Sequence, residues 1–345
     1  MTKRRLAITT VVVVIALALT GCSKSSKASS TRACIILPDS ASSARWENGD
    51  RPALDKALKA ANFETDIQNA QGDTAKFATI ADQQLSKGCG VMILVDYQGA
   101  ALAVAAKAKK AGIPVIAYDR PIAGADFYVS FDNETVGALE GQSILDGLKA
   151  KNIDPKTARV IYGQGDPTDG NAKMFYDGAV AVLSAAGVKP AFEMAGTWDG
   201  AKAGTLFEQA YTAVQGKVDA VLAPNDNNAA NIITILDKNH KVVPVSGQDA
   251  SPAGLQNVLL GKQTATVYKP FTLEATAASD LAIALLKGEK PTADKTLADG
   301  TPFIHVAPIL VGPDKVKDVV AAGDAKIAEV CTAALKAACA KYGVA

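Results

Sequence analysis

Histidine is scarce in this chain, with only His240 and His305 among 345 residues. The two fall on separate predicted elements, so neither a histidine-based zinc site nor a serine–histidine–aspartate triad has support from a local motif. The loop at residues 294–300 lacks the alternating oxygen ligands of a calcium-binding hand. Gly163-Gln164-Gly165 follows a predicted strand, but Thr168 stands where a dinucleotide-binding fingerprint has its third glycine. We therefore expect no metal ion and no cofactor.

An excess of either charge is also missing. The chain has 36 Lys and Arg residues against 35 Asp and Glu residues, a formal net charge of +1. Lys3, Arg4 and Arg5 belong to a segment that we expect to be removed, and subtracting their three charges leaves about −2. Proteins that bind nucleic acid carry a basic surface. We therefore expect no nucleic-acid partner.

The apolar run at residues 6–19 is too short for a typical membrane span, which needs about 20 residues. It follows three basic residues and ends in Leu19-Thr20-Gly21-Cys22, which resembles a bacterial lipobox. This pattern predicts a lipoprotein signal peptide at residues 1–21, lipid attachment to Cys22 and a lipidated linker at residues 22–32. Two acyl chains would hold the protein at the extracytoplasmic face of the bacterial cell membrane. The alternative is an uncleaved membrane helix.

Four cysteines remain besides Cys22, an even number in a compartment where disulfides form. Cys34 opens one predicted strand, and Cys89 comes just before another. Because the starts of parallel strands lie at the same end of a sheet, we expect a Cys34–Cys89 disulfide. Cys331–Cys339 is then the remaining pair. The alternative is four buried free thiols.

Short apolar runs alternate with amphipathic segments from residue 33 onward. The predicted strands are at residues 34–37, 64–68, 91–95, 115–118, 127–131, 159–162, 190–195, 220–223, 242–246, 264–268 and 305–311. The predicted helices are at residues 51–61, 74–87, 100–111, 134–149, 171–186, 201–216, 228–239, 251–260 and 273–287. This alternation predicts an α/β fold with parallel sheets covered on both faces. Residues 90–120 and 219–249 follow the same order of elements, which favours two similar lobes over a single ten-stranded sheet.

Polar residues follow several of these strands. The groups are Asp119-Arg120, Asp169-Gly170-Asn171, Asn225-Asp226 and Asp249. Each could be a turn or a helix cap, because Asp and Asn cap helices well. However, open α/β sheets bind ligands at the carboxyl ends of their strands. Carboxylates, amides and cations together suit a ligand with many hydroxyl groups, and hydrogen bonds to charged groups contribute roughly 1.5–3 kcal/mol each.

Four further residues have side chains that suit such a ligand. Arg45 supplies several fixed donors, and the indoles of Trp46 and Trp198 could stack on the apolar faces of a sugar ring. Lys269 is a donor just before Pro270, which ends a strand. For Arg45 and Trp46 the alternative is a surface Arg beside a partly buried Trp.

Six strings carry a resemblance to a known family. They are Ala44-Arg45-Trp46, Ala117-Tyr118-Asp119-Arg120, Tyr128-Val129-Ser130-Phe131-Asp132-Asn133-Glu134, Asn171-Ala172-Lys173, Ser246-Gly247-Gln248-Asp249-Ala250 and Thr266-Val267-Tyr268-Lys269-Pro270. In this order they resemble the periplasmic sugar-binding proteins of ABC importers, from about residue 33 to about residue 310. The resemblance implies the type I architecture of that family, in which two Rossmann-like lobes with parallel sheets are joined by a three-segment hinge.

The resemblance also implies how the chain divides. The N-terminal lobe would comprise residues 33–131 and 270–303, and the C-terminal lobe residues 132–269 and 304–345. The chain would cross between the lobes near residues 131–133, 268–270 and 303–306.

By the same resemblance, a sugar would lie between the lobes. The residues expected to bond to its hydroxyl groups are Arg45, Arg120, Asp169, Asn171, Asn225, Asp249 and Lys269. Trp46 and Trp198 would stack on its two faces, and Gly170 stands where the family pattern has another Asn.

The implied function is that of a monomeric binding protein, not an enzyme. It would take a monosaccharide, D-xylose or a related aldopyranose such as glucose, and deliver it to an ABC transporter permease. Two alternatives stay open: a binding protein for another polyol or a signalling furanose, and a secreted glycosidase. The glycosidase would use two of Asp119, Asp169 and Asp249 as its carboxyl pair.

Overall fold

The computed structural model of the chain describes residues 31–345. The expected signal peptide, Cys22 and all but the end of the linker lie outside the described residues. Within residues 31–345, no helix has both the length and the hydropathy needed to cross a membrane.

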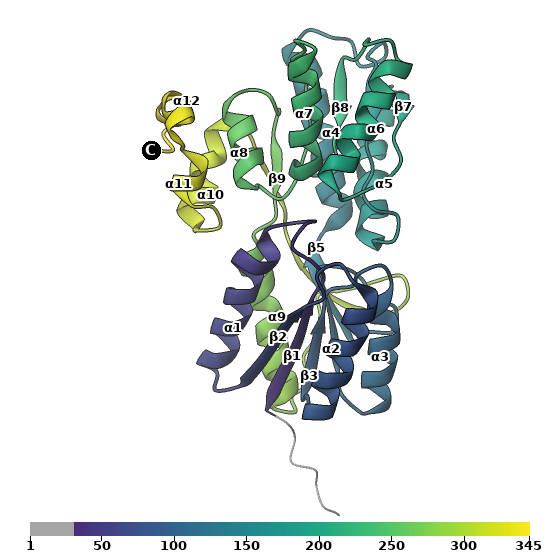
Figure 1. Cartoon of the computed structure of the whole chain (residues 1–345), viewed down its shortest axis with the longest axis vertical. Coiled ribbons are helices and arrows are strands. Elements are labelled where there is room, and N and C mark those ends of the chain that lie inside the picture. The colour runs from purple at the N-terminus through teal and green to yellow at the C-terminus, as the bar shows by residue number, and fades with distance from the viewer. Residues whose placement is uncertain (1–30) are drawn as a thin grey trace, which may run out of the picture.

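The chain forms two α/β lobes, one above the other in Figure 1. The lower lobe is built on a seven-stranded sheet with strand order β10-β11-β5-β4-β3-β1-β2. Its strands are β1 (Arg32–Leu37), β2 (Glu64–Asn69), β3 (Val91–Leu94), β4 (Val115–Tyr118), β5 (Phe127–Phe131), β10 (Lys295–Thr296) and β11 (Pro302–Val306). Its helices are a π-helical turn (Trp46–Asp50), α1 (Arg51–Ala60), α2 (Thr74–Lys87), α3 (Ala100–Lys110) and α9 (Phe271–Leu286). All pairings are parallel except that of β10 with β11.

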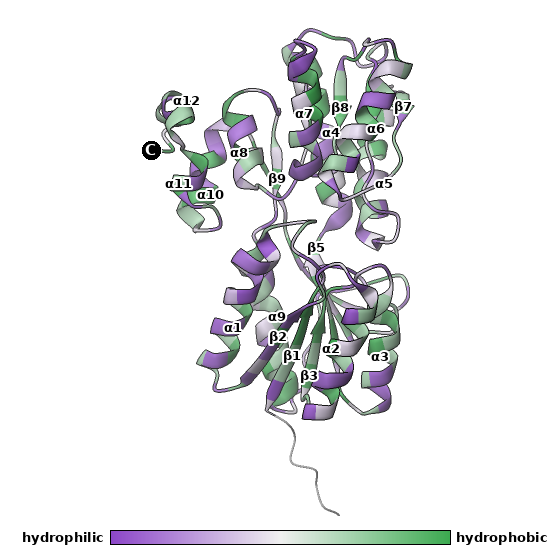
Figure 2. Cartoon of the chain, in the orientation of Figure 1, coloured by the Kyte–Doolittle hydropathy of each residue, from purple (hydrophilic) through white to green (hydrophobic). Residues whose placement is uncertain are grey.

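Helices cover both faces of this sheet because its inner strands are apolar on both sides. The side chains of β3 and β4 are all buried. One face packs on α2 and α3 through residues such as Phe77 and Val104, and the other packs on α1 and α9 through Leu54 and Leu281. Figure 2 shows the same division, with hydrophobic strands inside and hydrophilic outer helix faces. The predicted parallel α/β architecture is confirmed.

The upper lobe repeats this plan on a smaller sheet, with strand order β7-β6-β8. Its strands are β6 (Val160–Tyr162), β7 (Pro190–Glu193) and β8 (Ala220–Leu222), and a separate pair joins β9 (Thr266–Tyr268) to β12 (Ile309–Val311). Its main helices are α4 (Asn133–Ala150), α5 (Gly170–Ala185), α6 (Gly200–Ala213), α7 (Asp226–Lys238) and α8 (Pro252–Leu259). The α4 and α5 helices pack on one face of the three-stranded sheet, and α6 and α7 pack on the other.

The chain passes between the lobes three times. The first passage joins β5 to α4, the second joins β9 to α9, and the third joins β11 to β12. β11 pairs with β5 as far as Val306, so the third passage lies at residues 307–308, beyond the expected boundary at residue 303. The predicted single strand at residues 305–311 is therefore two strands, and Pro308 separates them.

Two other regions differ from the sequence-based expectation. The predicted strand at residues 242–246 is reduced to an isolated bridge between Val245 and Val221, because Pro244 removes a ladder donor. The chain end, without a predicted element, forms the 3-10 turns Pro313–Lys315 and Ala333–Leu335 and the helices α10 (Val316–Ala322), α11 (Ile327–Val330) and α12 (Lys336–Lys341). These short elements share a core with α8.

Both expected disulfides are present in the structure. Cys34, on β1, is bonded to Cys89, just before β3, and Cys331 is bonded to Cys339. The first joins neighbouring strands of the lower sheet, and the second closes the short helical tail. The alternative of four free thiols is therefore wrong.

Candidate functional site

The nine residues expected to contact a ligand line one cavity where the two lobes meet. They are Arg45, Trp46, Arg120, Asp169, Asn171, Trp198, Asn225, Asp249 and Lys269. The same cavity is lined by Ser42, Ser43, Asp119, Phe175 and Gln248. The lining residues numbered below 132 come from the lower lobe. The others come from the upper lobe or from its passage between β9 and α9, so a ligand held here would touch both lobes.

Arg45 is held by three carboxyl groups. Its Nε and Nη2 donate to Asp50 at 2.8 Å, its Nη1 donates to Asp119 at 3.1 Å, and its Nη2 also donates to Glu274. The guanidinium lies 4.6 Å from the centre of the Trp46 ring. Asp50 and Glu274 are fully buried and do not line the cavity, whereas Arg45 does. The two buried carboxylates therefore hold the guanidinium in place at the cavity wall. Burial raises the pKa of Glu274 well above its usual range, although the Arg45 charge opposes that shift.

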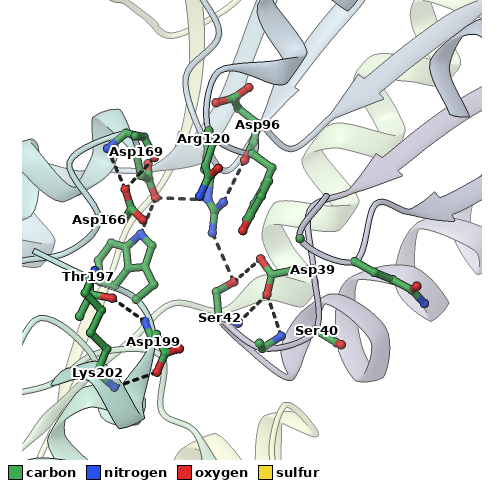
Figure 3. Close-up of a pocket in the computed structure, with 17 residues that line it drawn as sticks. Asp39, Ser40, Ser42, Asp96, Arg120, Asp166, Asp169, Thr197, Asp199 and Lys202 are labelled. Carbon is green, nitrogen blue, oxygen red and sulfur yellow. Dashed lines mark hydrogen bonds and ion pairs between the residues drawn. The ribbon is translucent and has the colours of Figure 1, made fainter. Parts of the chain in front are cut away.

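Arg120 joins the lobes directly. It follows Asp119, whose φ of +61° turns the chain sharply at the end of β4. Its Nη1 donates to the carbonyl oxygen of Asp96 at 2.9 Å, and its Nε lies 3.2 Å from the Asp169 carboxylate of the upper lobe. Arg120 also contacts the Ser42 hydroxyl at 3.4 Å. Figure 3 shows Arg120 between Asp169 and Ser42.

The beginning of α5 supplies the upper-lobe partners. Asp169 caps the helix by accepting from the Asn171 N–H at 2.9 Å, and its other oxygen accepts from the Trp198 indole at 3.1 Å. Burial raises the pKa of Asp169, against the lowering effect of Arg120. The Asn171 side chain donates to the Asp119 carbonyl oxygen at 2.7 Å and accepts from the Tyr128 hydroxyl at 2.9 Å. Both bonds cross between the lobes.

The far wall of the cavity carries a second ion pair. The Lys269 Nζ lies 2.8 Å from the Asp249 carboxylate and 5.3 Å from the centre of the Phe175 ring. Burial lowers the pKa of Lys269, but the charges of Asp249 and Asp119 and the bond to Asp249 together outweigh that effect and raise the pKa, so the lysine is charged at neutral pH. Asn225 caps α7 through its Oδ1, which accepts from the Asn228 N–H at 2.8 Å.

The cavity adjoins a larger chamber of about 350 Å³. Ser42, Arg120, Asp169 and Trp198 border both spaces. The chamber is also lined by the buried Asp39, the partly buried Tyr97 and Asp166, and the exposed Asp199 and Lys202. Arg120 and its partners Ser42 and Asp169 thus lie at the boundary between the cavity and the chamber.

This arrangement suits a neutral ligand with several hydroxyl groups. Each cation of the cavity is already paired with a carboxylate, so a ligand need not supply charge. Asp119 Oδ1, Asp249 Oδ2 and Asn225 Nδ2 make no hydrogen bond within the described part of the chain. Carboxylate and amide groups of this kind accept from and donate to hydroxyl groups. Among residues 31–345, no group of three His, Cys, Asp or Glu residues could hold a metal ion.

Five cavity residues lay outside the expected ligand set. Asp119 was visible as a strand-end residue, and Gln248 stands beside Asp249 in the same string. Ser42 and Ser43 belong to a serine-rich loop, and Phe175 lies inside α5. No local sequence pattern distinguishes these three cavity-lining residues from ordinary loop or core residues.

The fold and the cavity together define a class: a two-lobed α/β protein that encloses a small polar ligand at its hinge. Residues 34–290 match the family described as the periplasmic binding protein domain. The chain belongs to this family of periplasmic binding proteins.

The chain is also similar to individual sugar-binding proteins. The D-xylose-binding periplasmic protein of Escherichia coli (strain K12) is 36% identical over 289 residues, which cover 80% of this chain and 85% of that protein. The multiple sugar-binding periplasmic receptor ChvE of Rhizobium radiobacter is 32% identical over 317 residues, covering 84% of this chain and 89% of that protein. The crystal structure of a carbohydrate transporter solute binding protein from Chloroflexus aurantiacus, in complex with D-glucose, aligns with a TM-score of 0.78 at 27% identity. That alignment covers 87% of this chain and 98% of the other.

Proposed function

We propose that this chain is a lipid-anchored extracytoplasmic binding protein that captures a monosaccharide between its lobes and delivers it to an ABC sugar importer. The expected ligand is D-xylose or a related aldopyranose such as glucose. The observation that carries the proposal is that all nine expected residues line one cavity between the lobes. The names of the relatives, a D-xylose-binding protein and a multiple sugar-binding receptor, support the class of ligand.

The cavity offers the two kinds of contact that a pyranose needs. Carboxylate and amide atoms that have no partner among residues 31–345 would bond to ring hydroxyl groups, each contributing roughly 1.5–3 kcal/mol where the partner is charged. The indoles of Trp46 and Trp198 would cover the apolar C–H faces. Because the ligand would touch both lobes, its binding would favour the closed arrangement, which is the form that a membrane permease could distinguish.

Isothermal titration of the purified protein against xylose, glucose, galactose, arabinose and ribose tests the ligand. We expect a saturable 1:1 response to one or two aldopyranoses, xylose or glucose among them. Silence across these five sugars would refute the monosaccharide proposal.

Xylitol belongs in the same series, because a xylitol-binding protein of Mycolicibacterium smegmatis is 26% identical over 248 residues, which cover 71% of this chain. Binding of xylitol but of no aldose would favour the open-chain polyol alternative. The lipid anchor is tested separately, by mass spectrometry of the membrane fraction: Cys22→Ser should release an unlipidated protein, and retention of the lipid mass would contradict it.

A further inference from the structure

A buried carboxylate lies behind the upper-lobe half of the cavity and does not line it. Asp226 is the first residue of α7 and is completely buried. No Lys, Arg or His of residues 31–345 lies within ion-pair distance of it. A buried carboxylate without a cation is costly unless hydrogen bonds satisfy its oxygens. The positive end of the α7 dipole supplies part of the compensation.

The hydrogen-bond partners of Asp226 are all donors from the segments that carry Asp249 and Lys269. Oδ2 accepts from the Ser251 N–H at 2.8 Å, and Oδ1 accepts from the Gln263 side chain at 2.8 Å. The Thr266 hydroxyl lies within 2.9 Å of Oδ1 and 3.1 Å of Oδ2. One carboxylate therefore ties together the loop after Asp249 and the strand β9 that leads to Lys269.

The loop that it holds is strained. Asp249 has a φ of +98° and Ala250 a φ of +48°, conformations that cost non-glycine residues about 1–3 kcal/mol each. The Asp249 N–H donates to the Val267 carbonyl at 2.8 Å, and the Ala250 N–H donates to the Thr266 hydroxyl at 3.1 Å. Since Thr266 accepts from Ala250, its own proton is free to go to Asp226. The result is a hydrogen-bond relay: Asp226 orients the Thr266 hydroxyl, and that hydroxyl in turn holds the strained corner of the chain at Asp249 and Ala250.

Two glycines pack closely against this carboxylate. A Cβ at Gly254 would lie 2.0 Å from Asp226 Oδ2, and one at Gly247 would lie 2.5 Å from Oδ1. The backbone adds a second link, because the Asp226 N–H donates to the Gln248 carbonyl at 3.0 Å while the Gln248 side chain donates to the Pro224 carbonyl at 2.8 Å. The loops that present Asn225 and Asp249 are thus fastened to each other through Asp226.

We propose that Asp226 is a positioning residue, which through Thr266 and Ser251 holds the strained corner at Asp249 and so aims the Asp249 carboxylate at the ligand. This inference rests on the proposed function, because it assigns a role to a residue that the ligand would not touch. The ionised form of Asp226 performs the role, since all of its partners donate. A protonated carboxyl would direct its own O–H at Thr266 and compete with the Ala250 N–H.

The role is therefore sensitive to pH. Burial raises the pKa of Asp226 to about 7, and the Asp249 charge adds to the shift, while the bonds from Gln263, Ser251 and Thr266 oppose it. Glu140 of α4 also lies close enough for its pKa to be influenced by Asp226, and Lys269 is paired with Asp249 on the cavity side. As the pH falls through about 7, Asp226 gains a proton, the relay is lost and sugar affinity should fall.

The test compares sugar affinity at pH 8 and pH 5.5 for the parent protein, Asp226→Asn and Thr266→Val. At pH 8 each variant should bind about tenfold more weakly, the loss expected for one hydrogen bond to a charged group. At pH 5.5 the gap between the parent and Asp226→Asn should shrink to about twofold or less, because the parent has lost its own relay. Thr266→Ser keeps the hydroxyl and should restore affinity at pH 8. Asp237→Asn is the matched control on α7, because Asp237 is exposed and pairs with Lys262.

Each outcome has one meaning. A constant affinity ratio at both pH values, with Thr266→Ser no better than Thr266→Val, would overturn the proposal and leave Asp226 a structural residue only. Equal affinity of Asp226→Asn and the parent at pH 8 would also overturn it. If the parent binds no sugar at either pH, the proposed function fails, and that result is distinct from either of these. Circular dichroism at both pH values confirms that each variant is folded.

Discussion

Lys269 and Asp249 show how much of the site depends on single side chains. The pair is largely buried, with side-chain exposures of 9% and 14%, and its atoms lie 2.8 Å apart. Asp249 still has a free oxygen beside the cavity, so it can hold Lys269 and accept from a hydroxyl group at the same time. Removing one partner of a buried pair is costly, because it leaves the other charge without compensation.

We predict that Asp249→Ala abolishes sugar binding, with an affinity loss of at least about a hundredfold, while the fold stays intact. Titration calorimetry measures the affinity, and circular dichroism checks the fold. Asp177→Ala is the matched control, because Asp177 forms an exposed pair with Lys173 on α5. An unchanged dissociation constant for Asp249→Ala would show that Asp249 takes no part in binding.

At this scale, the sequence carried more information about charged residues than about neutral ones. Asp and Arg residues directly after buried strands are unusual enough to be noticed, and Asp119, Arg120 and Asp249 were all found in that way. Phe175 was not, because a Phe inside a helix is indistinguishable from a core residue until the helix is placed. Asp226 was visible beside Asn225, but its burial and its donors depend on Ser251, Gln263 and Thr266, which are distant in sequence.

At the scale of elements, two helix beginnings serve both the fold and the cavity. Asp169 and Asn225 each cap a helix and also line the cavity. Capping and ligand contact were alternatives when only the residues were known. The structure removes the conflict, because a helix that starts after a strand directs both its cap and its free N–H groups to the carboxyl end of the sheet.

Element boundaries failed where proline or short length blurred the pattern. Pro244 and Pro308 lie inside two apolar runs that look continuous in the sequence, and both interrupt the pairing. The tail helices α10, α11 and α12 have seven, four and six residues, too few for a helical period to appear. Their packing depends on α8 and on the Cys331–Cys339 disulfide rather than on local propensity.

The two disulfides should differ in their contribution to stability. Cys34 and Cys89 are 55 residues apart, whereas Cys331 and Cys339 are 8 apart. Because the longer loop loses more conformational entropy on closure, replacing Cys34 and Cys89 by Ala should lower the free energy of unfolding by about 4 kcal/mol. The same double replacement of Cys331 and Cys339 should lower it by about 2.5 kcal/mol. Urea denaturation under oxidising conditions measures both values, and an equal or reversed order would contradict the loop-length argument.

At the scale of the whole molecule, the two lobes are joined by three passages and by direct bonds across the cavity. The bonds from Arg120 to Asp169, from Asn171 to Asp119 and from Tyr128 to Asn171 link the lower lobe to the beginning of α5. The passages run from β5 to α4, from β9 to α9 and from β11 to β12. The third passage lies a few residues later than expected, because the pairing of β11 with β5 extends it.

We expect sugar to close the lobes about this hinge. A ligand that contacts both lobes binds the closed arrangement more tightly, so it shifts the population toward that form. Small-angle scattering should show a smaller radius of gyration at saturating sugar for the parent protein and for Asp177→Ala. Asp249→Ala should show no change at the same sugar concentration. A radius that stays constant on saturation of the parent would contradict hinge closure.

The most direct test of the central claim uses the two tryptophans. Trp46 and Trp198 are the only tryptophans in the sequence, and both line the interlobe cavity, so tryptophan emission reports on this site alone. We predict a saturable change in emission on titration with D-xylose or D-glucose, with the same dissociation constant as calorimetry. Trp46→Phe and Trp198→Phe should each retain part of the change. Calorimetric binding of the sugar with no change in emission would place the sugar elsewhere and contradict a ligand held between the two indoles.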